Sequence, residues 1–192
     1  MKSLGALLLS AALVLSLGTA ATAQVGLDLH GLYAFNFNDD DDGFNGDDTF
    51  GGGASLVFCL GDIVKLDLGG DYLLPENEDD SDVKAQLIPV TATLRIGVPI
   101  EEVAYLYVGG GGGYSFNDWD LKGGDDDLFD LEDCFTYHAC GGAELLFSPN
   151  IGIRAEFRYI WLKPESKFKP TGTKTDVKFD HMQARGGLVL YF

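Results

Sequence analysis

The segment from Asn150 to Trp161 constrains the fold more than any other, because both of its alternating sets of residues are chemically coherent. Successive side chains of an extended strand point to opposite faces. One face here is apolar and ends in aromatic residues: Ile151, Ile153, Ala155, Phe157, Tyr159 and Trp161. The opposite face carries Gly152, Arg154, Glu156 and Arg158. A soluble sandwich would bury the apolar face, but aromatic residues at its end favour a narrow barrel with charges inside and lipid outside.

Residues 1–23 are predicted to be a secretory signal peptide. Lys2 gives a positive start, the apolar run from Leu4 to Leu17 is too short to cross a bilayer as a helix, and Ala21-Thr22-Ala23 forms a small-x-small cleavage site. No Cys follows that site, which argues against a lipoprotein anchor. We therefore expect one mature domain over residues 24–192.

The mature chain alternates between apolar-patterned segments and breaks that are short and long by turns. The expected strands span about 25–37, 54–60, 64–74, 84–98, 103–116, 134–147, 150–161 and 182–192. The short breaks are 61–62, 99–102 and 148–150, and the long ones are 38–49, 75–83, 117–133 and 163–175. No later stretch could cross a membrane as a helix, so insertion requires a closed barrel. The pattern predicts an all-β protein, an eight-stranded antiparallel up-and-down transmembrane β-barrel with short turns on the periplasmic side.

Two backbone features modify this prediction. Pro89 removes a ladder hydrogen bond, so we expect a bulge or a local opening there. The glycine run 109–113 allows a sharp bend in the wall or leaves room for large lumen side chains. A phosphate-binding loop is the alternative for this run, but the Lys-Ser/Thr pair and the helix that should follow are missing.

Outward-facing aromatic residues are expected to form two interfacial girdles. The girdle near the long loops comprises Tyr33, Phe35, Tyr72, Tyr114, Phe116, Phe135, Tyr137, Tyr159 and Trp161, and the girdle near the short turns comprises Phe58, Phe147 and Phe192.

The inward face carries charges whose signs balance. They are Asp28, Lys65, Asp67, Asp71, Arg95, Glu144, Arg154, Glu156, Arg158 and Arg185. Eight strands leave room only for side chains inside the barrel, and an unpaired buried charge is costly. We therefore predict a lumen plugged by internal salt bridges.

Four motifs occur in an order that resembles the small outer-membrane β-barrel family, which includes OmpA-like transmembrane domains, OmpX and the opacity-type, porin-like proteins. They are Ile88-Pro89-Val90-Thr91, the run 107–111, Ser148-Pro149-Asn150 followed by 154–159, and Tyr191-Phe192. The resemblance covers the whole mature chain. It implies a monomer in the Gram-negative cell outer membrane, in contact with lipid and lipopolysaccharide. It also implies that Phe192 is the signal read by the barrel-assembly machinery.

The long loops contain more Asp than is usual in that family. Their acids are Asp39 to Asp42, Asp47, Asp48, Glu76, Glu78, Asp79, Asp80, Asp82, Asp118, Asp120, Asp125, Asp126, Asp127 and Asp130. Asn38-x-Asp40-x-Asp42-Gly43 resembles the start of a calcium-binding EF-hand loop, but Thr49 stands where Glu should be. Two interpretations of these acids therefore remain: a site for divalent cations such as Ca²⁺, or a solvated acidic rim. In the last loop, Lys163, Lys167, Lys169 and Lys174 could bridge to these acids or to lipid phosphates.

His138-x-Cys140 is the one pair with catalytic potential, because lipid A deacylases are small barrels with a His-x-Ser pair. That pair faces lipid, whereas His138 and Cys140 fall on the inward face, so we expect no enzyme. His30, His138 and His181 are predicted to be hydrogen-bonding groups, with a shared metal site as the alternative. Spacing leads us to expect no disulfide among Cys59, Cys134 and Cys140.

The sequence thus predicts an outer-membrane barrel with no cofactor that acts in envelope structure or in cell-surface interaction through its acidic loops, where a surface ligand could bind. A net charge of −17 makes nucleic acid a poor partner. The alternative function is a narrow channel or a barrel that binds a small ligand or a divalent cation. A lipid A-modifying enzyme is the less favoured third class.

Overall fold

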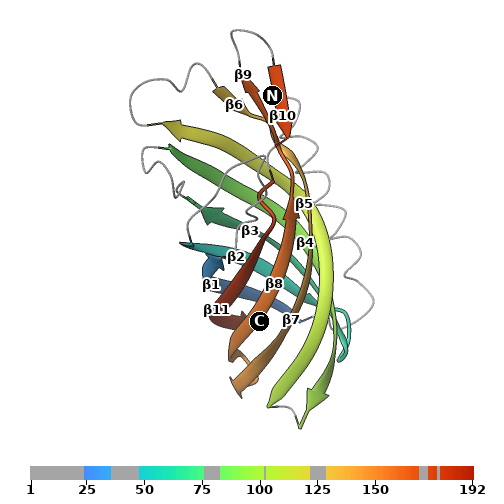
Figure 1. The fold of residues 1–192 in the computed structure, drawn as a ribbon. Helices are drawn as coiled ribbons and strands as arrows, with labels where there is room; N and C mark the ends of the chain where they lie inside the picture. The colour runs from blue at the N-terminus through green and yellow to red at the C-terminus, as the bar shows by residue number, and fades with distance from the viewer. Residues whose placement is uncertain are drawn as a thin grey trace.

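Eight long strands close into an antiparallel barrel in the computed structural model, which describes residues 24–35, 48–75, 83–101, 103–121, 129–168, 173–176 and 178–192 (Figure 1). The strands are β1 (Val25–Phe35), β2 (Thr49–Cys59), β3 (Val64–Leu73), β4 (Val83–Ile100), β5 (Ala104–Leu121), β7 (Cys134–Ser148), β8 (Ile151–Leu162) and β11 (His181–Tyr191). Each pairs with its neighbour along the chain, and β1 pairs with β11 to close the ring. The predicted fold class is confirmed. The predicted signal peptide lies outside the described residues.

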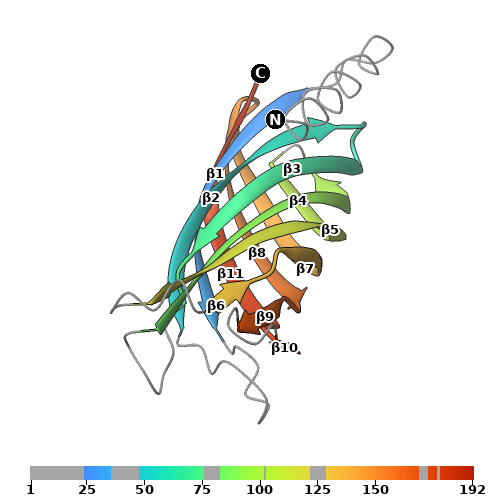
Figure 2. The same cartoon turned by 90° about the horizontal axis from the view of Figure 1, so that it is seen from above.

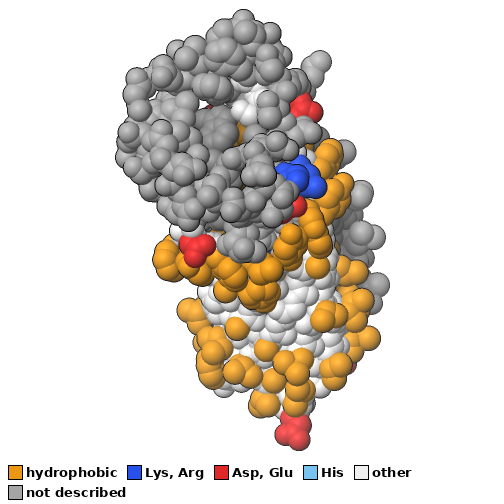
Figure 3. Space-filling view, in the orientation of Figure 1, with side chains coloured by type: hydrophobic (Ala, Val, Ile, Leu, Met, Phe, Trp, Pro, Cys, Tyr) orange, Lys and Arg blue, Asp and Glu red, His pale blue; other side chains and the backbone are white. Residues whose placement is uncertain are grey.

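The wall follows the period-two pattern that predicted it. Along β8, residues alternate strictly between exposed and buried from Ile151 to Arg158. On the face of the barrel seen in Figure 3, apolar side chains gather along the sides and towards the two ends of the wall. The ten steps from Ile151 to Trp161, at about 3.4 Å each and a tilt of about 40°, cover about 25 Å along the barrel axis. That height matches the apolar band of a transmembrane barrel. Among the described residues, no helix has the length and apolar character needed to cross a membrane.

The hairpin of β4 and β5 is longer than predicted. The predicted ends at residues 98 and 116 are wrong, because pairing continues from Val83↔Leu121 at one end to Ile100↔Ala104 at the other. At the short end, Val103 N donates to Ile100 O over 3.0 Å, and Glu101 in the turn adopts a φ of 46°. Residues 117–121, predicted to be loop, therefore extend the wall.

Two predicted loops also contain regular structure. Strands β6 (Phe129–Leu131), β9 (Glu165–Phe168) and β10 (Thr173–Asp176) form a separate sheet in the order β10-β9-β6. This sheet lies at the long-loop end of the barrel (Figure 2). The prediction of long breaks with no strand at 117–133 and 163–175 is therefore corrected. Tertiary pairing between two distant loops forms this sheet, and no local alternation signals it.

Pro89 opens the wall locally without shifting its register. Pairing with β5 is continuous through Pro89↔Ser115. On the β3 side, however, the pairs step from Gly70↔Val90 to Leu73↔Leu87 and leave out the two positions between. The predicted local opening is thus present, while an irregularity in β7 between Leu146 and Ser148 was not predicted.

The glycine run leaves room for lumen side chains, as predicted. A Cβ on Gly111 would lie 2.0 Å from Ala92 O and 2.9 Å from His138 Cε1. No side chain fits there. The backbone of β5 is therefore packed directly against its neighbouring strand and against the lumen side chain of His138.

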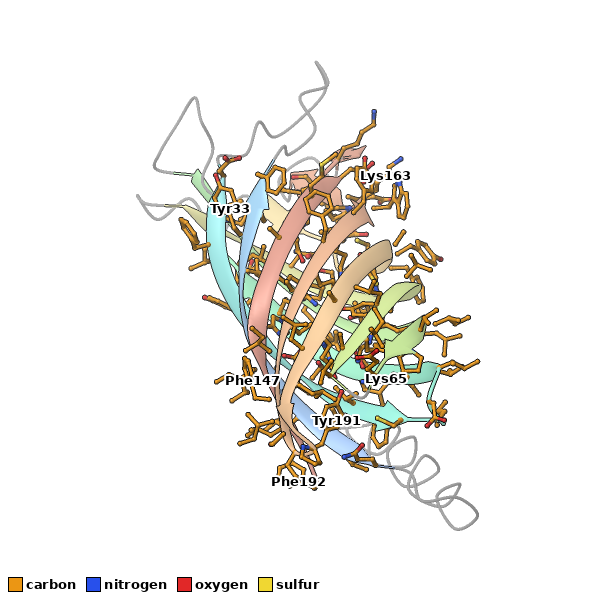
Figure 4. The ribbon with its side chains drawn as sticks, turned by 90° about the horizontal axis from the view of Figure 1, so that it is seen from below. Tyr33, Lys65, Phe147, Lys163, Tyr191 and Phe192 are labelled. Atoms are coloured by element: carbon orange, nitrogen blue, oxygen red, sulfur yellow. The ribbon has the colours of Figure 1, made fainter. Side chains whose placement is uncertain are left out.

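The two predicted girdles occupy opposite ends of the barrel. Tyr33 and Lys163 lie at the long-loop end, and Phe147 and Phe192 lie at the other (Figure 4). Tyr33 packs against Phe50, with ring centroids 4.9 Å apart. Phe50, which is 80% exposed, belongs to the same girdle and was not predicted.

Candidate functional site in the barrel lumen

The inward charges form two groups, and the larger is centred on Arg154. This Arg154 cluster comprises Asp28, Lys65, Asp67, Arg95, Glu144 and Arg154, all buried. Arg154 Nη1 contacts Asp28 Oδ2 at 2.7 Å and Asp67 Oδ2 at 3.2 Å, and its Nη2 contacts Glu144 Oε2 at 3.3 Å. Arg95 Nη2 contacts Asp67 Oδ1 at 2.5 Å, and Lys65 Nζ contacts Glu144 Oε1 at 2.9 Å. Three cations meet three anions, so the cluster is neutral.

The second group, the Arg158 cluster, comprises Asp71, Glu156, Arg158 and Arg185. Glu156 and Arg158 lie two residues apart on β8 and therefore share a face, and Arg158 Nε and Nη2 contact Glu156 Oε1 at 3.0 and 2.7 Å. Arg185 bonds to Asp71 and lies 3.6 Å from Glu156 Oε1. This cluster holds two charges of each sign and is also neutral.

His30 links the two clusters. Its Nε2 lies 2.9 Å from Asp71 Oδ1 in the Arg158 cluster, and its Nδ1 lies 3.4 Å from Asp28 Oδ2 in the Arg154 cluster. Sequence reasoning placed His30 in the lumen but did not assign it to the charge network. The signal was present, because Asp28 and His30 lie two residues apart on one strand face.

Inward tyrosines complete the network, and sequence reasoning missed them by considering aromatic residues only on the outer face. Tyr191 Oη donates to Glu144 Oε1 at 2.5 Å, and Tyr107 Oη donates to Glu156 Oε2 at 2.9 Å. Lys65 Nζ lies 4.4 Å from the centroid of the Tyr105 ring. Such cation–π contacts stabilise a cation that has left water.

Buried apolar side chains lie in the lumen on both sides of the charges. Towards the long loops, the buried cluster comprises Leu32, Ala34, Leu73, Ala85, Leu87, Leu131, Ile160, Leu162 and Phe179. Towards the short turns, Val57, Val189 and Tyr191 pack with Cys59 and Leu146. Leu131 and Phe179 come from β6 and from the segment before β11, so loop segments supply part of the outer cluster. The charged inward face predicts a polar lumen, and these apolar layers were not predicted.

The three histidines are hydrogen-bonded, as predicted. His138 Nε2 lies 2.8 Å from Thr93 Oγ1, and His181 Nδ1 lies 2.6 Å from Phe179 O. His138 and Cys140 are both buried in the lumen, away from lipid. Cys59, Cys134 and Cys140 are free thiols.

The described residues contain no group of three or more His, Cys, Asp or Glu side chains arranged to hold a metal ion. The EF-hand-like segment 38–43 and most of the loop acids lie outside the described residues. Asp48 is described, and it accepts a hydrogen bond of 2.5 Å from Tyr33 Oη. The predicted assembly signal, Phe192, is 77% exposed at the short-turn end.

Comparison with known proteins gives one family match and several similar folds. The sequence model of the family described as outer membrane protein beta-barrel domain matches residues 6–192. No curated protein matches the chain.

Solved structures with this fold share little sequence with the chain. Neisserial surface protein A is 16% identical with a TM-score of 0.62, covering 90% of this chain and 98% of its own. OprG of Pseudomonas aeruginosa is 14% identical with a TM-score of 0.70, covering 88% and 96%. Outer Membrane Protein W of E. coli is 14% identical with a TM-score of 0.61, covering 91% and 100%. At these identities the similarity shows the fold.

Proposed function

Because the chain belongs to the outer-membrane β-barrel family, we propose that it is a closed, non-conducting barrel that acts in envelope structure or cell-surface interaction through its acidic loops. The family and the apolar outer face support a position in the outer membrane. Two further claims are tested separately: that the lumen does not conduct, and that the acidic loops bind a partner.

The observation that carries the closed lumen is the succession of side-chain layers across the inside of the barrel. Two neutral charge clusters occupy its middle, and apolar layers lie on both sides. Arg95 and Glu144 are each fully buried and Phe179 is 0% exposed. A hydrated ion would have to break buried ion pairs and then enter an apolar layer, and both steps are costly.

The distribution of charge supports a role for the loops. The net charge of the chain is −17, whereas the ten charged side chains of the two lumen clusters cancel. The excess negative charge therefore lies outside these clusters, and the sequence places most acids in the long loops. A cell-surface partner at this end would present cationic groups or be joined through divalent cations.

Single-channel recording of the purified barrel in planar lipid bilayers tests the closed lumen. We expect no reproducible openings at protein levels where a porin prepared in the same way gives discrete steps. Clear and repeated steps of constant conductance would contradict the closed lumen and favour the narrow-channel alternative.

The loops are tested separately by gel mobility of outer-membrane fractions, boiled and unboiled, with and without a calcium chelator. A shift on boiling alone supports a compact barrel with a solvated acidic rim. A shift that also depends on the chelator would instead make the loops a divalent-cation site.

A further inference from the structure

Three residues that line one small cavity in the charge network each have a buried polar atom without a partner. Within the described part of the chain, Asp28 Oδ1, His30 Nδ1 and Arg154 Nε have no hydrogen-bond partner. A cavity of about 10 Å³ is lined by these same three residues together with Glu156, Arg185, Gly186 and Gly187. The side chains of Asp28, His30 and Arg154 are 4%, 4% and 6% exposed.

Buried polar groups without a partner are rare, because each has lost its hydrogen bonds to water. His30 Nδ1 is 3.4 Å from Asp28 Oδ2, which is longer than a normal hydrogen bond to nitrogen. The neighbouring atoms of the same residues are well paired, since Asp28 Oδ2 lies 2.7 Å from Arg154 Nη1. Two further unpartnered atoms, Arg95 Nε and Nη1, belong to a residue that does not line this cavity.

We propose that one ordered water molecule occupies this cavity and bonds to Asp28 Oδ1, Arg154 Nε and His30 Nδ1. A carboxylate oxygen only accepts and a guanidinium nitrogen only donates, so the occupant must do both. Water does both, and it meets the imidazole nitrogen in either protonation state. A buried water typically makes about three hydrogen bonds, and a cavity of roughly 10–15 Å³ measured for water centres holds one.

The charges around the cavity balance, because Arg154 and Arg185 stand against Asp28 and Glu156. The lining therefore favours a neutral occupant over either a cation or an anion. The available space is also that of a single water. The site lies where His30 links the two clusters, so the water completes the network at the junction between them.

The test is nuclear magnetic resonance of uniformly ¹⁵N-labelled protein folded in lipid nanodiscs. Rotating-frame cross-peaks to water separate direct contact from proton exchange by their sign. We expect a direct-contact peak at the Arg154 Nε–H, identified by its loss in Arg154→Lys. The exposed Asp48 amide serves as the positive control and the Ala155 amide in the wall as the negative one. If the Asp48 amide shows water contact and Arg154 Nε–H does not, the site is dry and the proposal is wrong.

Two adjacent glycines provide a matched pair of variants. Gly187 lines the cavity, and a Cβ there would lie 2.6 Å from His30 Cβ, whereas a Cβ on Gly186 meets nothing within 4 Å. We expect loss of the Arg154–water peak in Gly187→Ala and its retention in Gly186→Ala. An unchanged peak in folded Gly187→Ala would overturn the placement of the water. If Gly187→Ala does not fold, because it also crowds the Leu29 carbonyl, the wild-type measurement decides the question.

Discussion

Removing the charge of Glu144 should destabilise the barrel severely, because this carboxylate is the anion shared by the cations of the Arg154 cluster. It is 0% exposed. Lys65 Nζ, Arg154 Nη2 and Arg95 Nη1 lie 2.9, 3.3 and 3.6 Å from its oxygens. Glu144→Gln keeps the shape but leaves three cations facing two anions.

Breaking a buried ion pair by removing one partner costs about 3–5 kcal/mol. We therefore expect the equilibrium constant for unfolding to rise by a factor of roughly 100 to several thousand, at about 1.4 kcal/mol per factor of ten. Urea unfolding in lipid vesicles, followed by tryptophan fluorescence and by gel mobility, measures this change. Glu101→Gln, in an exposed turn, is the matched control and should shift stability by less than about 0.5 kcal/mol.

A compensating variant separates charge imbalance from loss of packing. Adding Lys65→Met to Glu144→Gln returns the Arg154 cluster to two charges of each sign. The double variant should be less destabilised than the sum of the single variants, by about 0.5–3 kcal/mol. Equal stability of Glu144→Gln and Glu101→Gln, or strict additivity in the double variant, would refute the reasoning.

Three further substitutions test the barrel wall, the buried apolar cluster near the long loops and the assembly signal. Gly111→Val should sharply reduce the folded fraction in unboiled gels, because a Cβ would lie 2.0 Å from Ala92 O, while Gly186→Ala should leave it unchanged. Phe179→Ala should lower the free energy of unfolding by about 3–5 kcal/mol in urea titrations, since its side chain is fully buried; a change below about 1 kcal/mol would show that it does not pack in the lumen. Phe192→Ala should reduce the amount of protein in outer-membrane fractions but lower the urea midpoint of protein folded in vitro only slightly, because Phe192 is 77% exposed and its ring has few protein contacts to lose. A large drop in the midpoint would instead indicate a packing role.

Much of the wall was predictable from particular residues. Alternation of Arg154, Glu156 and Arg158 with Ile153, Ala155 and Phe157 determines which side chains face the lumen, and β8 has that arrangement. The same alternation assigns ten charged residues to the inward face; nine of them are buried and Arg185 is partly buried. The limits of β4 and β5 were not predictable, because the hairpin extends wherever its two strands can still pair, and residues 117–121 have a loop-like acidic composition.

The lumen partners were also beyond sequence reasoning. Lys65 contacts Glu144 and Tyr191, which are 79 and 126 positions away along the chain. Which anion meets which cation depends on the height of each strand in the ring, and that is fixed by the registers of all eight pairings together. Phe179 is a further case. It packs in the buried apolar cluster near the long loops because the segment before β11 passes over that end of the lumen.

The sequence by itself determined the number of wall strands and the face on which most of their charged residues lie, because a strand alternates its side chains with a period of two, whatever it pairs with. Only the tertiary structure decided the division of the charges into two neutral clusters, the linking position of His30 and the apolar layers above and below them. These features arise across the lumen between strands that are distant in the chain. They depend on closure of β1 against β11, which no local pattern of residues encodes.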